Sequence, residues 1–292
     1  MSDYKIITDS TSDMPESFYE ENNVGVMCIP YILNGVTHTE ENPIEPKEFY
    51  RMMREDGVLP TTSQISPAAA RTYLEKFLKE TKKLLVLAFS SGLSGSYNST
   101  KLAADMIMED DPEANIIVID TLAAHLGEGL VVYTAVENKK KGMSFEENAK
   151  WISDHIQNFI HVFTVDDLFH LHRGGRVSKT AAVVGTMMSI KPVLHVDHEG
   201  HLIPLFKARG RKKAIKGLVD HYEEKIRGYE QPYDVVMVGH SDCAEELEEV
   251  KAEIEKRFGK KTFIENYIGP TIGAHTGPGT LTLFFMGRDR DN

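Results

Sequence analysis

LLVLAFSSGLSGSY, residues 84–97, joins an uncharged apolar run to a turn made almost entirely of serine and glycine. A continuous Leu/Val/Phe run of this length is typical of a strand buried on both faces, as in a parallel sheet covered by helices. A helical pattern follows at once, so the free backbone N–H groups of its first turn point into the serine-glycine turn. We therefore expect a site for a carboxylate or a phosphate at the carboxyl end of this strand. A simple Ser/Gly helix cap is the alternative.

The same strand, turn and helix order recurs before and after this segment. Tyr4–Thr8 and Asn115–Ile119 read as strands, each followed by a polar turn and a helical pattern. Asn34-Gly35 lies between two short β-rich runs and predicts a hairpin, because both residues tolerate positive φ. Strands that alternate with helices predict an α/β domain with a doubly wound, mostly parallel sheet over residues 1–159.

The second half of the chain has a different pattern. Two β-rich runs flank Asp197–Gly200 and predict a second hairpin, and amphipathic helices and further strands follow. Ser178–Ser189 reads as a helix of small residues. This mixture predicts an α+β domain with a largely antiparallel sheet over residues 160–292, so the chain should contain two domains.

Composition excludes several classes of function. The 292 residues carry a net charge of −11, which argues against a broad nucleic-acid-binding surface. No apolar stretch is long enough to span a membrane, the N-terminus lacks the pattern of a secretory signal, and the two cysteines lack metal-ligand spacing. The chain also lacks G-x-G-x-x-G, Walker A, HExxH and CxxC motifs. We expect a soluble cytoplasmic protein without membrane association, metal or cofactor.

Three further segments carry candidate site residues. Thr62 and Ser63 lie in a hydroxyl-rich segment, read as a loop, that precedes a helix. If neighbouring parallel strands bring this loop beside the serine-glycine turn, Thr62 and Ser94 can donate two hydrogen bonds to one carboxylate; local helix capping is the alternative. His275 lies among four glycines and two prolines, which indicates a loop. Arg173 and Arg176 bracket two glycines and can clamp an anion or contact a partner.

A serine hydrolase is a second hypothesis. Its nucleophile turn needs G-x-S-x-G, whereas residues 92–96 read Gly-Leu-Ser-Gly-Ser, with serine in place of the last glycine. Ser94 and His275, with one of several aspartates, would then act on acyl esters. A third hypothesis is a regulatory, lipid-sensing protein.

Six segments together resemble the DegV family of fatty-acid-binding proteins. They are ITDSTSDMP (7–15), TTSQISPAA (61–69), SSGLSGSY (90–97), RGGRVSK (173–179), SIKPVL (189–194) and GPTIGAHTGPG (269–279). They span nearly the whole chain in the family's order. The resemblance implies a carrier, not itself an enzyme, that holds one long-chain fatty acid between two domains. A partner fatty acid kinase, through its ATP-binding subunit, would convert the presented carboxyl to an acyl-phosphate for phospholipid synthesis.

The resemblance also assigns residues. The hydroxyls of Thr62 and Ser94 would bind the carboxylate, and the supporting polar network would comprise Ser63, Gly92, Gly95, Ser96, His275 and Arg173. Apolar and flexible side chains suited to the acyl chain are Val184, Met187, Met188 and Ile190. For the kinase, the turn Arg173–Lys179 and the basic segment around Arg209 are the expected docking face.

Overall fold

The first half of the chain builds a four-stranded sheet in which all neighbouring strands are parallel, in the order β2-β1-β6-β7. The computed structural model describes residues 4–178 and 190–291. The strands are β1 Tyr4–Asp9, β2 Gly25–Met27, β6 Lys83–Ala88 and β7 Asn115–Asp120, and the helices are α1 Glu16–Glu21, α3 Pro67–Phe77, α4 Ser96–Asp110, α5 Leu126–Lys140 and α6 Phe145–Asp154. Leu84 through Leu87 are fully buried, because helices cover both faces of the sheet. The predicted parallel sheet is confirmed.

The second half builds a six-stranded sheet in the order β10-β9-β8-β13-β11-β12. Among the strands that the structure describes in it, only β11 and β12 pair in parallel, so the predicted, largely antiparallel sheet is also confirmed. Its strands are β8 Phe159–Thr164, β9 Ile190–Val196, β10 Leu202–Arg209, β11 Val235–His240, β12 Thr262–Tyr267 and β13 Leu281–Met286, and its helices are α7 Phe169–Arg173, α9 Arg211–Ile226, α10 Ala244–Phe258 and α11 Pro270–Thr276. The helix predicted for Ser178–Ser189 lies, but for Ser178, outside the described residues.

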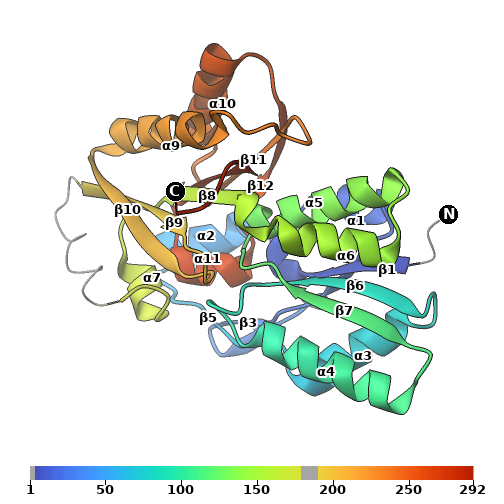
Figure 1. The fold of residues 1–292 in the computed structure, drawn as a ribbon. Helices are drawn as coiled ribbons and strands as arrows, with labels where there is room; N and C mark the ends of the chain where they lie inside the picture. The colour runs from blue at the N-terminus through green and yellow to red at the C-terminus, as the bar shows by residue number, and fades with distance from the viewer. Residues whose placement is uncertain (1–3, 179–189, 292) are drawn as a thin grey trace.

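The two sheets alternate with three layers of helices (Figure 1). Helices α3 and α4 cover the outer face of the four-stranded sheet, and α9 and α10 cover the outer face of the six-stranded sheet. Helices α5 and α6 lie between the sheets, where one apolar core joins Leu85 and Leu87 of β6 to Phe284 and Met286 of β13. We call each sheet with its outer helices a lobe. The first strand of the C-terminal lobe begins at Phe159, but the shared core crosses between the lobes, and the domain boundary near residue 159 stays a prediction.

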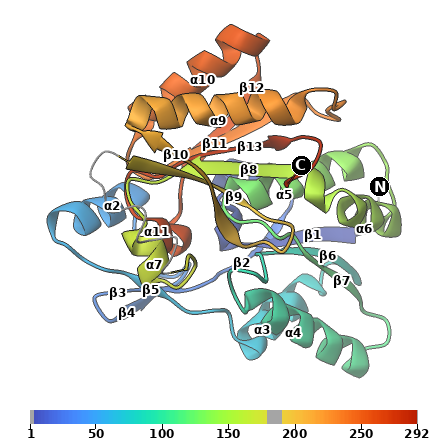
Figure 2. The same ribbon diagram turned by 60° about the vertical axis from the view of Figure 1, so that its left-hand side comes forward.

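A third, three-stranded sheet lies at one side of the lobes, beside α11 (Figure 2). It contains β3 Tyr31–Leu33, β4 Val36–His38 and β5 Thr61–Thr62, and α2 Pro46–Glu55 follows β4. The predicted hairpin is present, with positive φ at Asn34 (51°) and Gly35 (78°). The loop predicted around Thr62 is wrong at this point, because Thr61 and Thr62 pair with β3. This pairing fixes Thr62 in an extended backbone.

His275 lies in the last turn of the short helix α11, so the loop predicted for it is also wrong. The glycines and prolines that indicated a loop mark the ends of this helix. Pro270 occupies the first turn, where a missing N–H is harmless, and Gly277 ends the helix with a φ of 75°. None of the described helices combines the length and apolar composition needed to cross a bilayer.

Candidate functional site

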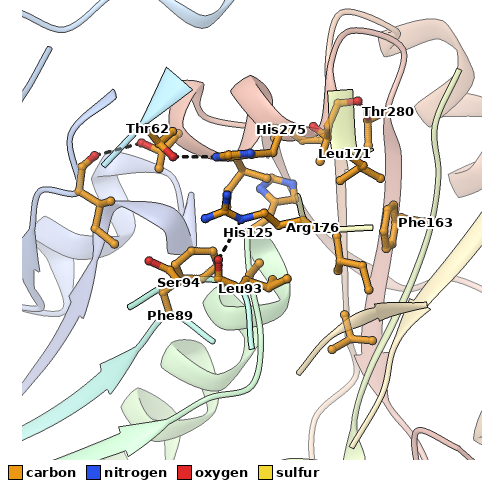
Figure 3. Close-up of a pocket in the computed structure, with 18 of the residues that line it drawn as sticks. Thr62, Phe89, Leu93, Ser94, His125, Phe163, Leu171, Arg176, His275 and Thr280 are labelled. Carbon is orange, nitrogen blue, oxygen red and sulfur yellow. Dashed lines mark hydrogen bonds between the residues drawn. The ribbon is translucent and has the colours of Figure 1, made fainter. Parts of the chain in front are cut away.

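A cavity of about 930 Å³, including the space at its mouth, lies between the lobes. From the N-terminal lobe its apolar wall includes Ile29, Phe89, Leu93 and Ala124, and from the C-terminal lobe Phe163, Leu171, Val196, Leu202 and Phe284. The inward-facing positions on β8 and β13 alternate with residues packed under α9 and α10, as the pleat of a strand requires. Figure 3 shows several of these side chains around the open space.

Thr62 and Ser94 both line this cavity, although 32 residues separate them in sequence. Thr62 Oγ1 lies 2.7 Å from His275 Nε2, and His275 also lines the cavity (Figure 3). Burial, with smaller contributions from Arg176 and Arg173, lowers the pKa of His275 to about 4. The imidazole is therefore neutral at pH 7, and its ring can donate to or accept from Thr62.

The serine-glycine turn is held by its own hydrogen bonds. Ser94 Oγ donates to Ser96 Oγ (2.9 Å) and accepts from the Ser96 amide (3.2 Å), and Ser96 Oγ accepts from the Ile65 amide (3.3 Å). The last bond ties the turn to the segment that carries Thr62. A Cβ at Gly95 would displace the side-chain amide of Gln64, which donates to Ser99 Oγ (3.0 Å) where these two segments meet.

The remaining predicted network residues divide between the cavity wall and the layer behind it. Ser63 and Gly95 line the cavity. Ser96 is buried behind Ser94. Gly92 does not line the cavity; it lies against the backbone of Gly200 in the β9–β10 turn, where a Cβ would not fit. Its role is to let the serine-glycine turn approach the C-terminal lobe.

Of the two arginines that bracket Gly174-Gly175, the structure brings Arg176 rather than Arg173 to the cavity wall. Arg176 Nε donates to the Leu93 carbonyl (3.0 Å) and links the two lobes (Figure 3). Arg173 lies behind His275 and donates to the carbonyls of Pro60 (2.7 Å) and Ala274 (3.0 Å). Arg173 thus ties the start of β5 to α11, which positions both Thr62 and His275.

The acyl-chain residues predicted from sequence contribute little to the described wall. Val184, Met187 and Met188 lie outside the described residues. Ile190 begins β9, half-buried, and is not among the described side chains that line the cavity. The apolar wall comes instead from strands and loops of both lobes. Alternation on β8 and β13 was the sequence signal for the inward side chains, since Phe163 and Phe284 alternate with buried core residues.

A buried acidic cluster supports the cavity wall from behind. Thr11 Oγ1 contacts both Asp9 Oδ1 and Glu128 Oε2, and Thr8 Oγ1 donates to Glu128 Oε1. One hydroxyl hydrogen cannot serve two carboxylates, so a proton on Glu128 completes the chain from Glu128 through Thr11 to Asp9. Burial, reinforced by the charge of Asp9, raises the pKa of Glu128 well above its ordinary value. Asp9 Oδ2 in turn accepts from the amide of Phe89, which lines the cavity.

Metal ligation finds no support in this arrangement. Across residues 4–178 and 190–291, no three His, Cys, Asp or Glu side chains gather as a metal site would require. The cavity instead combines a few neutral hydroxyls, three imidazoles and one guanidinium with a largely apolar wall. It is suited to an amphipathic guest with a small anionic head.

Comparison with known proteins gives a consistent result. The family model described as "Uncharacterised protein, DegV family" matches residues 3–288. A DegV domain-containing protein of Clostridium perfringens is 39% identical, with all of both chains covered. A solved structure reporting fatty acid binding by a DegV family protein from Thermus thermophilus is 29% identical, with a TM-score of 0.87 over 98% of this chain and 99% of that one. A stearic acid-binding protein from Eubacterium ventriosum is 25% identical, with a TM-score of 0.83 over 97% and 98%.

Proposed function

The chain belongs to the DegV family, and we propose that it binds one long-chain fatty acid in the cavity between its lobes. The observation that carries the proposal is that Thr62 and Ser94, from two separate segments, line the same otherwise largely apolar cavity. The carboxylate accepts hydrogen bonds from these two hydroxyls, and the hydrocarbon chain lies against the apolar wall. For this, Ser94 Oγ turns its hydrogen from Ser96 Oγ to the carboxylate, and Ser96 Oγ can then donate to Ser94 Oγ in return. Fatty acid binding by the relatives from Thermus thermophilus and Eubacterium ventriosum supports this assignment.

His275 orients the hydroxyl of Thr62 so that it can donate to the carboxylate. When the neutral imidazole carries its hydrogen on Nε2, it donates to Thr62 Oγ1 at 2.7 Å and leaves the threonine hydroxyl hydrogen free for the ligand. The nearby guanidinium of Arg176 adds a positive potential but is already bonded to the Leu93 carbonyl. Neutral donors bind the carboxylate without pairing it permanently with a charge, so the head group stays available for transfer.

The apolar wall supplies most of the affinity. Burying a chain of about 16 carbons gains roughly 0.8 kcal/mol per methylene, of order 10 kcal/mol before ordering costs. A hydrogen bond to a charged group contributes about 1.5–3 kcal/mol. The two hydroxyls therefore fix the direction of the bound acid more than they fix the total affinity.

We expect Thr62→Val and Ser94→Ala each to weaken binding of stearic acid by about tenfold or more, because each removes one hydrogen bond to the carboxylate. Isothermal titration with delipidated protein measures the change. Thr61→Val and Ser91→Ala are matched controls, since both side chains are exposed beside the site without lining the cavity. Unchanged affinity in both site variants would refute the assignment of the head group.

The contacts of His275 favour a carrier over a serine hydrolase. A catalytic histidine bonds the nucleophile through one nitrogen and an acid through the other. His275 Nε2 bonds Thr62 rather than Ser94, and its Nδ1 has no hydrogen-bond partner in the described structure. Burial, with smaller contributions from two arginines, lowers its pKa to about 4, which weakens it as a base at neutral pH. Cleavage of an acyl ester that disappears in Ser94→Ala would revive the hydrolase hypothesis.

We further propose that the bound acid is presented to a partner fatty acid kinase. Arg173 and Arg176 both donate to backbone carbonyls of this chain, which leaves fewer of their N–H groups for a partner. The basic segment is the better candidate for docking: Lys207, Arg209, Lys212 and Lys213 are exposed and form no ion pair within the described residues. This surface would complement an acidic partner.

Charge reversal tests the docking surface. Arg209→Glu combined with Lys213→Glu should reduce acyl-phosphate formation by an added kinase at least about tenfold, because interface charges govern association. The affinity for stearic acid should not change. Lys150→Glu, an exposed charge reversal on α6, is the matched control. Undiminished phosphorylation in the double variant would exclude this surface as the docking face.

A further inference from the structure

Two buried histidines line the cavity without taking part in the proposed carboxylate site. His125 lies in the loop before α5 and is 3% exposed, and His161 lies on β8 and is 1% exposed. Both rings pack edge-on against Phe284, with centroid distances of 5.6 Å for His125 and 5.5 Å for His161. Thr282, two residues before Phe284 on β13, lines the cavity beside them. We call His125, His161 and Thr282 the inner polar patch.

The nitrogens of these rings have unused hydrogen-bonding capacity. His125 Nδ1 is held by Asp13 Oδ2 at 2.6 Å, but its Nε2 has no partner in the described structure. Neither nitrogen of His161 has a partner at good hydrogen-bond geometry, although the backbone of Gly127 lies close to the ring. Glycines leave room for both rings, since a Cβ at Gly239 would collide with His125 and a Cβ at Gly127 with His161. Buried polar atoms are normally paired, so these rings can take a hydrogen-bond partner inside the cavity.

The chemistry of the patch specifies what that partner is. Burial lowers the pKa of His161 well below its ordinary value, so the ring is neutral and offers one N–H donor and one nitrogen acceptor. Thr282 Oγ1 donates to the Gly239 carbonyl at 3.1 Å, which leaves its lone pairs free to accept. The patch thus presents donors and acceptors together. A hydroxyl group, which both donates and accepts, matches this set, whereas a plain methylene matches none of it.

We propose that the inner polar patch is a subsite for a hydroxyl group on the acyl chain, so that the cavity takes hydroxylated long-chain fatty acids. The inference rests on the proposed function, because it adds a second polar contact to a fatty acid already held by its carboxylate. It also explains why polar side chains occur away from the carboxylate site in a largely apolar wall. The distance along the chain from carboxylate to hydroxyl then becomes a specificity determinant.

Binding of a positional series tests this proposal in the unmodified protein. The probes are stearic acid and stearic acids that carry one hydroxyl at successive positions from carbon 3 to carbon 18. One position or a few adjacent positions should bind about tenfold tighter than stearic acid, as one net hydrogen bond supplies. If every hydroxylated acid binds no tighter than stearic acid, the proposal is wrong. If stearic acid and the whole series fail to bind, the proposed function fails instead.

A variant of His161 tests whether the inner polar patch causes the tighter binding of hydroxylated stearic acid. His161→Phe keeps an aromatic ring against Phe284 but removes both nitrogens. It should abolish the tenfold preference, measured as the ratio of hydroxystearic to stearic acid affinity in the same variant. His195→Phe is the matched control, because His195 is also a buried histidine of the same sheet but does not line the cavity. Retention of the preference in His161→Phe would overturn the assignment to this patch. Stearic acid binding reports that each variant is folded.

Discussion

Replacing Ala124 with tryptophan is expected to weaken stearic acid binding more than about 100-fold. Ala124 lines the cavity in the loop between β7 and α5, and it is only half-buried. An indole at this position would occupy space that the acyl chain needs. Displacing about four methylenes forfeits roughly 3 kcal/mol, which corresponds to more than 100-fold in affinity. Isothermal titration of Ala124→Trp against the unmodified protein measures the effect.

Ala68→Trp provides the control for this substitution. Ala68 is exposed on α3 and does not line the cavity, so the same change in size should leave stearic acid binding within about twofold. Circular dichroism and thermal unfolding establish that both variants are folded. Equal affinities for Ala124→Trp and Ala68→Trp would mean that the acyl chain does not lie in this cavity.

Arg290→Leu is expected to destabilise the protein by about 3–5 kcal/mol, the largest stability effect among the changes considered. Arg290 is 1% exposed, and its guanidinium donates to five carbonyls, those of Thr121, Leu122, Ile156, Phe159 and Asp197. Leucine would leave these acceptors without their shared donor. For a chain of this size, thermal unfolding should begin about 6–15 °C lower. Differential scanning calorimetry provides the measurement.

The carbonyls that Arg290 binds belong to both lobes, so the guanidinium holds the two lobes together close to the cavity. Thr121 and Leu122 precede the loop that carries Ala124 and His125. Arg288→Leu is the matched control: Arg288 is exposed and donates to the carbonyl of Glu224, and its loss should cost no more than about 1 kcal/mol. Similar losses from the two substitutions would contradict the role assigned to the buried guanidinium.

Local sequence patterns were sufficient to predict both sheets. The uncharged run ending at Phe89 requires burial on both faces, and Asn34-Gly35 selects a hairpin turn whatever surrounds it. The pairing of Thr62 with Tyr31 was missed because a two-residue strand has no pattern of its own and exists only through its partner. The helix around His275 was missed for a related reason: composition counts glycines and prolines but does not locate them at helix ends.

The hydroxyl residues of the candidate site could be predicted from the sequence, whereas the residues around them were harder to predict. Thr62, Ser94 and His275 were recognisable because their segments resemble a family's motifs, and the structure brings all three to one cavity. The choice between Arg173 and Arg176 depends on how the end of α7 meets α11, which a single sequence does not encode. The same holds for His125 and His161, whose approach to Phe284 requires glycines at positions 127 and 239.

A crystal structure of the protein with stearic acid tests the central claim most directly. The account predicts density for one acid between the lobes, with its carboxylate within hydrogen-bond distance of Thr62 Oγ1 and Ser94 Oγ and its chain against Phe89, Ala124 and Phe163. A carboxylate bound elsewhere, with these two hydroxyls contacting only protein or water, would contradict it.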